Sequence, residues 1–144
     1  MSGNLSAKAE IMINAPVSMV WDALMNPEQV KKYFFGTNIK SDWEVGSPVS
    51  FTGEYEGKVY QDKGTVLEKD LEKLLKYSYW SSMRGVPDTP ENYMNITYRL
   101  EEKGGRTHLS LVQDNVSSEK ERDHSEQNWN MVLGNLKKLL EEQD

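Results

Sequence analysis

The sequence predicts an α+β protein in which a curved antiparallel sheet of about six or seven strands packs against one long C-terminal helix. Three observations support this prediction. Two short helical patterns follow an opening strand, apolar and polar residues then alternate from residue 37 to residue 113, and the segment after residue 118 carries an apolar stripe at helical spacing. The alternating runs follow one another too closely for helical crossovers, which favours an antiparallel meander.

Composition narrows the class of protein. The 144 residues are 37% hydrophobic and 28% charged, which is typical of a globular chain with one core, and we expect a single domain over residues 1–144. The net charge of −6, with no basic run, disfavours nucleic acid and membrane surfaces as partners. The absence of cysteine excludes disulfides and thiolate metal sites. No signal peptide or long apolar segment is present, so a cytoplasmic protein is expected.

The opening segment predicts a strand and a short helix. Residues 5–13 alternate loosely between apolar and polar, as a half-buried strand does. Pro16 suits the first turn of a helix, because its fixed φ is already helical. The following residues form one apolar stripe at positions i, i+3, i+4 and i+7, namely Val17, Val20, Trp21 and Leu24.

A second short helix is predicted directly after the first. Asn26 is the expected N-cap, Pro27 the first helical residue, and Gln29 the residue that completes a capping box. This helix should end near Gly36, since glycine accepts the left-handed backbone found at helix ends. The aromatic run at residues 33–35 then lies where the helix meets the next strand.

The middle of the chain predicts the sheet. The strand-like runs are residues 48–55, 58–70, 73–80, 93–100 and 106–113. Gly53 and Gly64 interrupt two of these runs and predict bends or bulges. Strand alternation places Tyr77 and Tyr79 on one face and Trp80 on the other, and leaves open which face points inward.

The C-terminal segment predicts a long amphipathic helix. Ser118 and Glu121 form a possible capping box at its start. Its apolar stripe consists of Trp129, Val132, Leu133, Leu136, Leu139 and Leu140. Such a stripe must be covered, and the sheet is the surface available. Trp129 is the expected anchor of the core.

The sequence contains no recognisable catalytic, metal or cofactor motif. The histidines His108 and His124 have no ligand partners at suitable spacing, so a structural or solvent-facing role is expected for each. Acidic candidates for acid–base chemistry are selected by residue type alone, and a solvated role is expected for them: Asp62, Glu68, Glu101 and Glu102. Four methionines are expected mainly to fill the core: Met25, Met83, Met94 and Met131.

Several segments together resemble one known family. "INAPVSMVWDALMNPEQVKKYFFG" is similar to the family's opening strand, proline and paired short helices, and "VGSPVSFTGEYEGKVYQDKGTVLE" to its central hairpin, although Ser47 and Pro48 replace a usual glycine. "GGRTHLSLVQ" and "NWNMVLGNLKKLLEE" resemble its last strand and helix. The family is named for the C-terminal domain of the activator of the heat-shock protein 90 ATPase, and belongs to the START-like superfamily. The resemblance spans about Ser6 to Glu142.

The resemblance implies the helix-grip fold, in which the sheet grips the long helix around a cavity. The rings at residues 33–35 would close the mouth of this cavity. Its expected lining is Tyr33, Phe34, Phe35, Phe51, Tyr77, Tyr79, Trp80, Tyr98, Trp129, Leu133 and Leu136. The expected function is non-enzymatic binding of a small hydrophobic ligand. The alternatives are a cyclase or hydrolase acting on a hydrophobic or aromatic substrate, and a co-chaperone that binds heat-shock protein 90.

Overall fold

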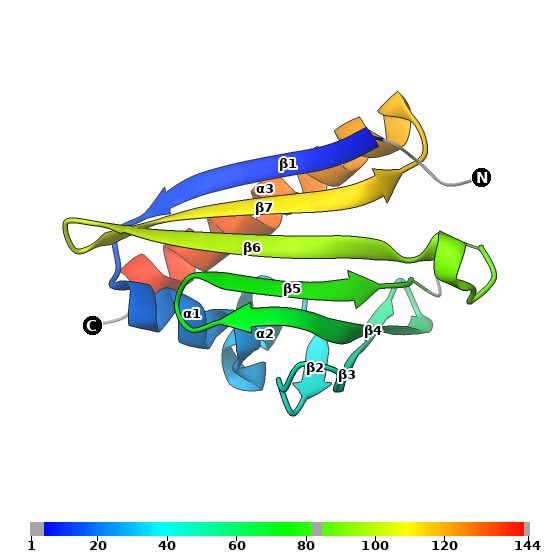
Figure 1. Cartoon of the computed structure of the whole chain (residues 1–144), viewed down its shortest axis with the longest axis horizontal. Coiled ribbons are helices and arrows are strands. Elements are labelled where there is room, and N and C mark those ends of the chain that lie inside the picture. Colours follow the sequence, from blue (N-terminus) through cyan, green and yellow to red (C-terminus); the bar gives the residue numbers. More distant parts are fainter. Residues whose placement is uncertain (1–4, 82–84, 143–144) are drawn as a thin grey trace.

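The computed structural model describes residues 5–81 and 85–142, so Met83 lies outside the described residues. Within these ranges it contains an antiparallel sheet of seven strands and three α-helices, as the α+β prediction required (Figure 1). The strands are β1 (Leu5–Ile13), β2 (Asn38–Ser41), β3 (Pro48–Tyr55), β4 (Lys58–Asp70), β5 (Leu74–Tyr79), β6 (Met94–Lys103) and β7 (Arg106–Val116). The helices are α1 (Val17–Met25), α2 (Pro27–Tyr33) and α3 (Glu119–Glu141), with a 3-10 turn, η2, at Pro90–Asn92.

The sheet is a meander closed at one edge by the first strand. Its order is β1-β7-β6-β5-β4-β3-β2, so every neighbouring pair is consecutive in the chain except β1 and β7. The sequence analysis did not single out β2 as a run. Its four residues bury only Ile39, which is too short a stretch to show alternation.

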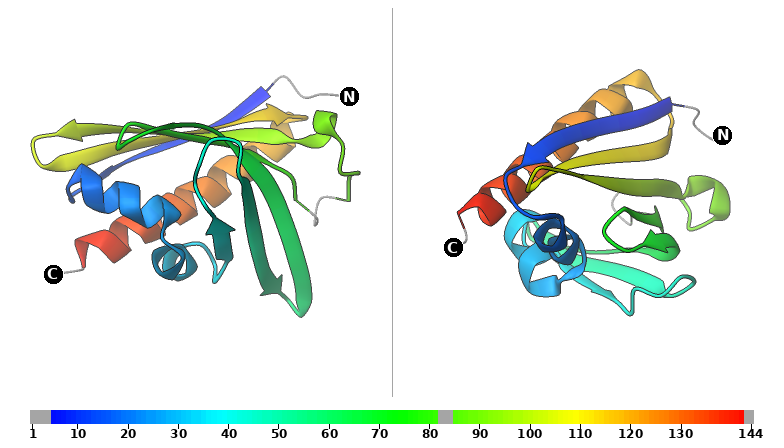
Figure 2. Two further views of the ribbon diagram at one scale, coloured as in Figure 1. Left: turned by 60° about the horizontal axis from the view of Figure 1, so that its bottom comes forward. Right: turned by 60° about the vertical axis from the view of Figure 1, so that its left-hand side comes forward.

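The sheet bends sharply within β4. Residues 58–65 of this strand pair with β3, whereas residues 66–70 pair with β5. At the change of partner, a Cβ on Gly64 would lie 1.6 Å from the carbonyl oxygen of Ser78. This close approach explains the glycine at a position where the sequence predicted a bend. The hairpin of β3 and the first half of β4 swings to the side of the sheet that carries the helices (Figure 2).

Helix α3 lies across the concave side of the sheet and packs chiefly along β1. The residues it buries are Trp129, Val132, Leu133, Leu136 and Leu140, all of them in the predicted stripe. Ser118 caps its start, because the side-chain oxygen accepts a hydrogen bond from the backbone N–H of Glu121 at 3.1 Å. The Glu121 carboxylate in turn accepts a hydrogen bond from the hydroxyl of Ser117 at 2.9 Å.

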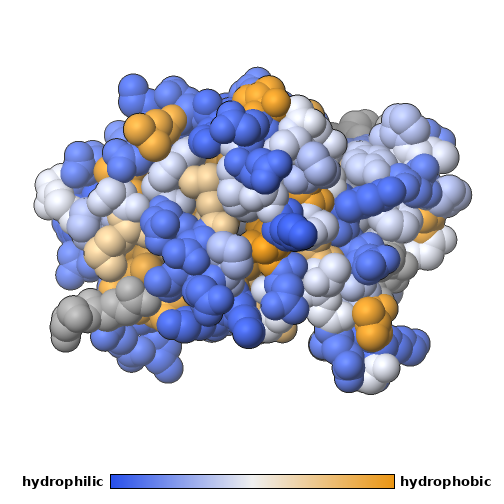
Figure 3. All heavy atoms as spheres, turned by 90° about the horizontal axis from the view of Figure 1, so that it is seen from below, coloured by the Kyte–Doolittle hydropathy of each residue, from blue (hydrophilic) through white to orange (hydrophobic). Residues whose placement is uncertain are grey.

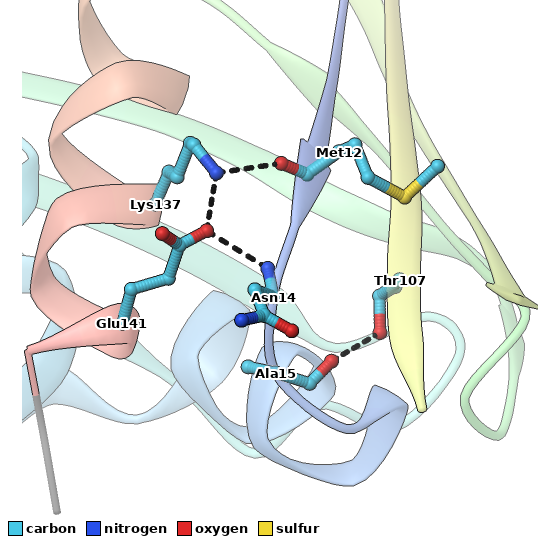
Figure 4. Close-up of polar contacts among 6 residues, drawn as sticks. All are labelled: Met12, Asn14, Ala15, Thr107, Lys137 and Glu141. Atoms are coloured by element: carbon cyan, nitrogen blue, oxygen red, sulfur yellow. Dashed lines mark hydrogen bonds and ion pairs between the residues drawn. The ribbon is translucent and has the colours of Figure 1, made fainter. Parts of the chain in front are cut away.

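The end of α3 is tied to the link between β1 and α1 (Figure 4). The Glu141 carboxylate accepts the backbone N–H of Asn14 at 2.8 Å and forms an ion pair with Lys137. The Lys137 ammonium also donates to the carbonyl of Met12 at 3.1 Å. The helix end therefore satisfies backbone groups that β1 leaves unpaired as it turns away from the sheet.

The two short helices form as the sequence predicts; α1 begins one residue after Pro16, and α2 begins at Pro27 as expected but ends at Tyr33, before Gly36. Pro16 is the N-cap of α1 rather than its first helical residue. Asn26 caps α2, and its side-chain oxygen accepts the backbone N–H of Glu28 at 3.0 Å. After α2 the chain turns through left-handed backbone at Phe35 (φ 52°) and Gly36 (φ 76°) before entering β2.

Candidate functional site

Aromatic rings on the concave side of the sheet form a continuous row of contacts. On the helix side, Phe34 meets Trp129 edge to face at a centroid distance of 5.6 Å. Trp129 meets Tyr98 of β6 edge to face at 6.5 Å. This part of the row joins the end of α2, the middle of α3 and the centre of the sheet.

The row continues along the sheet to the hairpin. Tyr98 lies 6.2 Å from Tyr77 of β5, and Tyr77 lies 5.6 Å from Phe51 of β3. Phe51 then meets Tyr79 edge to face at 5.3 Å. We refer to these six residues, Phe34, Trp129, Tyr98, Tyr77, Phe51 and Tyr79, as the aromatic row. Because Tyr77 and Tyr79 both contact Phe51, the face of β5 that they share is the inner one.

Buried phenols bring hydroxyl groups into this apolar surface. The hydroxyl of Tyr33 donates to the carbonyl of Ala23 at 2.8 Å, and the rings of Tyr77 and Tyr98 lie 6.2 Å apart. Burial raises the pKa of Tyr98 to about 12 and holds the pKa values of Tyr33 and Tyr77 well above the ordinary value. Each of these phenols therefore holds its proton more firmly than an exposed tyrosine does, and Tyr33 donates that proton in its hydrogen bond to Ala23.

A buried carboxylate lies at the hairpin end of the row. Asp62 of β4 is 6% exposed, and the hydroxyl of Tyr79 donates to its Oδ2 at 2.5 Å. Burial, followed by the charge of Asp62, raises the pKa of Tyr79 well above its usual value. Two residues before Asp62 in β4, the hydroxyl of Tyr60 lies 2.6 Å from that of Thr37, the residue that precedes β2. The apolar surface thus ends in a small polar cluster.

The helix side of the row carries a second polar contact. The indole N–H of Trp129 donates to the side-chain carbonyl of Gln113 at 2.6 Å. The amide nitrogen of Gln113 donates to the sulfur of Met94 at 3.0 Å and lies 3.4 Å from the hydroxyl of Ser125. These contacts fix the indole ring against β7.

The predicted lining residues fall into three groups. The aromatic row contains six of them, while Tyr33, Leu133 and Leu136 are buried beside it. Phe35 is 51% exposed and touches the ring of Phe34. Trp80 lies apart from the row: the Lys63 ammonium sits 5.8 Å from its ring centroid, and its indole N–H donates to the carbonyl of Pro87.

The sequence analysis did not place Asp62, Gln113 or Trp43 at this surface. Trp43 meets Tyr77 at 6.5 Å. A signal for Asp62 existed, because it stands at even spacing from Gly64 and Val66 and all three point inward. Glu68 follows an irregularity in the β4–β5 pairing and is exposed, as are Glu101 and Glu102.

Outside the aromatic row, the described residues include one groove and two histidines that were considered as possible sites. A groove of about 730 Å³ at the β4–β5 turn is lined mainly by charged residues and shares no residue with the aromatic row. His108 lies 3.7 Å from Glu10, and His124 is exposed. Among residues 5–81 and 85–142, no three His, Asp or Glu side chains are grouped so that they could hold a metal ion. No helix in the described part of the chain is long and apolar enough to cross a membrane.

Comparisons with known proteins give one family and several structures with the same fold. No curated protein matches the chain. The solution structure of protein ChR145 from Cytophaga hutchinsonii is similar, with 47% identity, a TM-score of 0.84, and coverage of 98% of this chain and 97% of that one. Two further structures share the fold. Protein MLL2253 from Mesorhizobium loti is 20% identical with a TM-score of 0.78, and the match covers 97% of this chain and 99% of that one. The Aha1 dimer from Colwellia psychrerythraea is 20% identical with a TM-score of 0.74, and the match covers 96% of this chain and 97% of that one.

The family described as Activator of Hsp90 ATPase homolog 1-like protein matches residues 14–141. This match covers most of the chain, from the link after β1 to the end of α3. It agrees with the helix-grip arrangement described above, a fold suited to binding small ligands between sheet and helix. The chain therefore belongs to the Activator of Hsp90 ATPase homolog 1-like family of the START-like superfamily.

Proposed function

We propose that this protein binds a small hydrophobic ligand against the aromatic row, between the sheet and α3. The observation that carries the proposal is the unbroken series of ring contacts from Phe34 to Tyr79 on the concave side. Binding sites for small molecules are mostly apolar and aromatic, with a few polar groups that fix orientation. The Asp62–Tyr79 pair is such a polar group.

The face beneath the sheet is consistent with ligand access. Figure 3 shows apolar surface in the middle of this face, framed by hydrophilic residues. The same view shows an indentation beside the lobe that projects at lower right, where Figure 2 places the β3–β4 hairpin. A ligand that enters between the helices and the hairpin would meet the aromatic row.

A titration followed by NMR tests this function. Hydrophobic and aromatic compounds are added while the indole N–H signals of Trp129 and Trp80 are followed. We expect saturable shifts at Trp129, which belongs to the row, and little change at Trp80, which lies outside it. A panel that leaves Trp129 unchanged, or that shifts Trp80 alone, contradicts the proposal.

The buried tyrosines favour binding over catalysis. General acid–base catalysis works best when the pKa of the catalytic group lies near the working pH. The pKa values of Tyr33, Tyr77, Tyr79 and Tyr98 all move away from neutrality. A cyclase or hydrolase activity is therefore the weaker alternative, and turnover of any bound aromatic compound would support it.

Family membership favours one further candidate, an interaction with heat-shock protein 90. The fold neighbour from Colwellia psychrerythraea carries the name Aha1, which is consistent with this idea. The test is the ATPase rate of the chaperone with and without this protein. An unchanged rate, together with no complex in size-exclusion chromatography, would count against it.

A further inference from the structure

We propose that the outward edge of β1 is a latent pairing surface for a second copy of this chain, and that polar side chains of α3 keep it closed. The outward edge consists of the backbone N–H and C=O groups that point away from β7. The side chains of α3 that bond to it are Glu126, Lys137 and Glu141, which we call the covering residues. This inference is independent of the proposed ligand site.

β1 is the longer of the two strands at the edges of the described sheet. It has nine residues, whereas β2 at the opposite edge has four. In an antiparallel pair only alternate residues bond to the neighbouring strand, so the residues between them direct their backbone groups away from it. A long row of such groups is a template for pairing with another chain unless something covers it.

Hydrogen bonds to α3 identify which residues of β1 face outward. The backbone N–H of Lys8 and the carbonyl of Met12 both bond to side chains of α3. The pairing of β1 with β7 continues without a bulge over residues 7–13, so these two contacts fix the alternation. Glu10 stands midway between them, and its backbone groups therefore point outward as well.

α3 presents the covering residues at the spacing that this edge requires. The Glu126 carboxylate accepts the N–H of Lys8 at 2.9 Å, and fifteen residues later the Glu141 carboxylate accepts that of Asn14 at 2.8 Å (Figure 4). The helix rises about 22 Å between the two glutamates, and the strand advances about 20 Å between the two amides. Lys137 lies on the same flank, since steps of eleven and four residues return to nearly the same side of an α-helix.

The covering residues compete with a second strand for the same backbone groups. A paired strand would lie about 4.8 Å from β1 and bring its own carbonyl and N–H groups to Lys8 and Met12. The Glu126 carboxylate and the Lys137 ammonium already occupy those hydrogen-bonding positions, at 2.9 and 3.1 Å. Removing both side chains would leave two backbone groups in need of new partners, which a second strand supplies.

The charges on β1 favour a second copy of the chain as that strand. Lys8 and Glu10 are exposed, carry opposite charges and lie two residues apart, so their side chains share one face of β1. Two β1 strands that pair antiparallel about Ala9 would place Lys8 of each copy opposite Glu10 of the other. Opposite charges directly across an antiparallel pair are stabilising. The resulting dimer would have two-fold symmetry, the commonest symmetry of homo-oligomers.

Two double variants that leave the net charge unchanged test the inference. Glu126→Ala/Lys137→Ala removes both covering groups, whereas Glu126→Gln/Lys137→Gln keeps an amide acceptor and an amide donor at the same places. Sedimentation equilibrium measures self-association. We expect the alanine variant to dimerise about tenfold or more tightly than either the glutamine variant or the unmodified protein, because each copy frees two backbone hydrogen-bonding groups.

A control on the same helix separates the edge from general surface effects. Lys138→Ala/Glu142→Ala removes one charge of each sign from exposed positions, so it should self-associate no more than the unmodified protein. Circular dichroism checks that each variant is folded. If Glu126→Ala/Lys137→Ala does not fold, the single variant Glu126→Ala, which uncovers the Lys8 amide, is measured in the same way and should also dimerise more tightly.

Amide hydrogen exchange locates the interface. In the dimer of the alanine variant, the amides of Lys8 and Glu10 should exchange more slowly than in its dilute monomer, because both would bond to the second copy. A folded alanine variant that self-associates no more than the unmodified protein overturns the inference. A dimer that leaves the Glu10 amide unprotected also overturns it, as does equal self-association of the alanine and glutamine variants.

Discussion

The indole Nε1 of Trp129 donates a hydrogen bond to the side-chain carbonyl of Gln113 at 2.6 Å, which joins α3 to β7 within the core. Both residues are 6% exposed. A buried acceptor that loses its donor costs more free energy than the hydrogen bond contributes in place, because the acceptor is then neither solvated nor paired. Trp129 therefore stabilises the fold in two ways: it buries a large apolar side chain, and it pairs the buried side-chain carbonyl of Gln113.

Replacing Trp129 with Phe tests the value of this contact. We expect the variant to lower the free energy of unfolding by about 1–3 kcal/mol, since it leaves the Gln113 carbonyl without its indole donor and fills less volume. Urea denaturation measures the change. Met131→Ala is the control on the same helix: Met131 is 56% exposed and should change stability by less than about 0.5 kcal/mol. Equal effects of the two variants would contradict this account.

The glycines at positions 64 and 134 should respond in opposite directions to alanine. A Cβ at Gly64 would lie 1.6 Å from the backbone oxygen of Ser78, so Gly64→Ala should cost about 3 kcal/mol or more, or prevent folding. A Cβ at Gly134 meets nothing within 4 Å on an exposed turn of α3, so Gly134→Ala should stabilise the protein by about 0.5–1 kcal/mol. Thermal and urea unfolding would measure both. A tolerated alanine at residue 64 would show that the bend does not need this close approach.

The buried tyrosines predict unfolding at alkaline pH. The pKa of Tyr98 is about 12 in the folded protein against an ordinary value of 10.0, so the folded state holds this proton more firmly than the unfolded state does. Its contribution to stability is complete below pH 10 and is lost as the pH rises to about 12. The loss from Tyr98 alone amounts to about 2–3 kcal/mol. Tyrosinate absorbance of the buried group should appear together with loss of circular dichroism; ionisation within a folded protein would argue against it.

The end of α3 predicts a sensitivity on the acid side. The hydrogen bond from Lys137, then that from the backbone of Asn14, lowers the pKa of Glu141. A lowered pKa stabilises the folded state above the ordinary carboxyl pKa and ceases to do so as the pH falls through the folded value. Glu141→Gln should therefore be less stable than the unmodified protein at neutral pH and nearly equal to it at pH 3. A difference that persists at pH 3 would indicate a packing effect. Glu142→Gln, at the next and exposed position, is the control.

The sequence predicted those elements of the fold in which the pattern of apolar residues repeats over several helical turns or strand positions. The stripe of α3 recurs often enough to identify every buried position on that helix, although Leu139 is only partly buried. The strand β2 has no such repetition, because Ile39 is its single buried residue. Which face of β5 points inward was also undetermined, since it depends on the partners that Tyr77 and Tyr79 meet across the sheet.

The candidate site was predictable in its apolar part and not in its polar part. Aromatic residues can be proposed as lining residues from their type alone, because large apolar rings are usually buried. Six of the residues proposed in this way form the aromatic row. Asp62 has the same residue type and strand setting as many solvated acids. Its burial arises because β4 changes partner at Gly64 and folds the hairpin toward the helices, a tertiary event that local pattern does not report.

The pairing of β1 with β7 sets an order for assembly during synthesis. Every other neighbouring pair of strands joins segments that leave the ribosome one after the other, so the middle of the sheet forms by local contacts. β1 emerges before all of them, yet the surfaces that cover it, β7 and α3, emerge last. Of the strands in this sheet, the first to be translated is thus the last to be covered, and until then its apolar residues are available to chaperones or to other nascent chains.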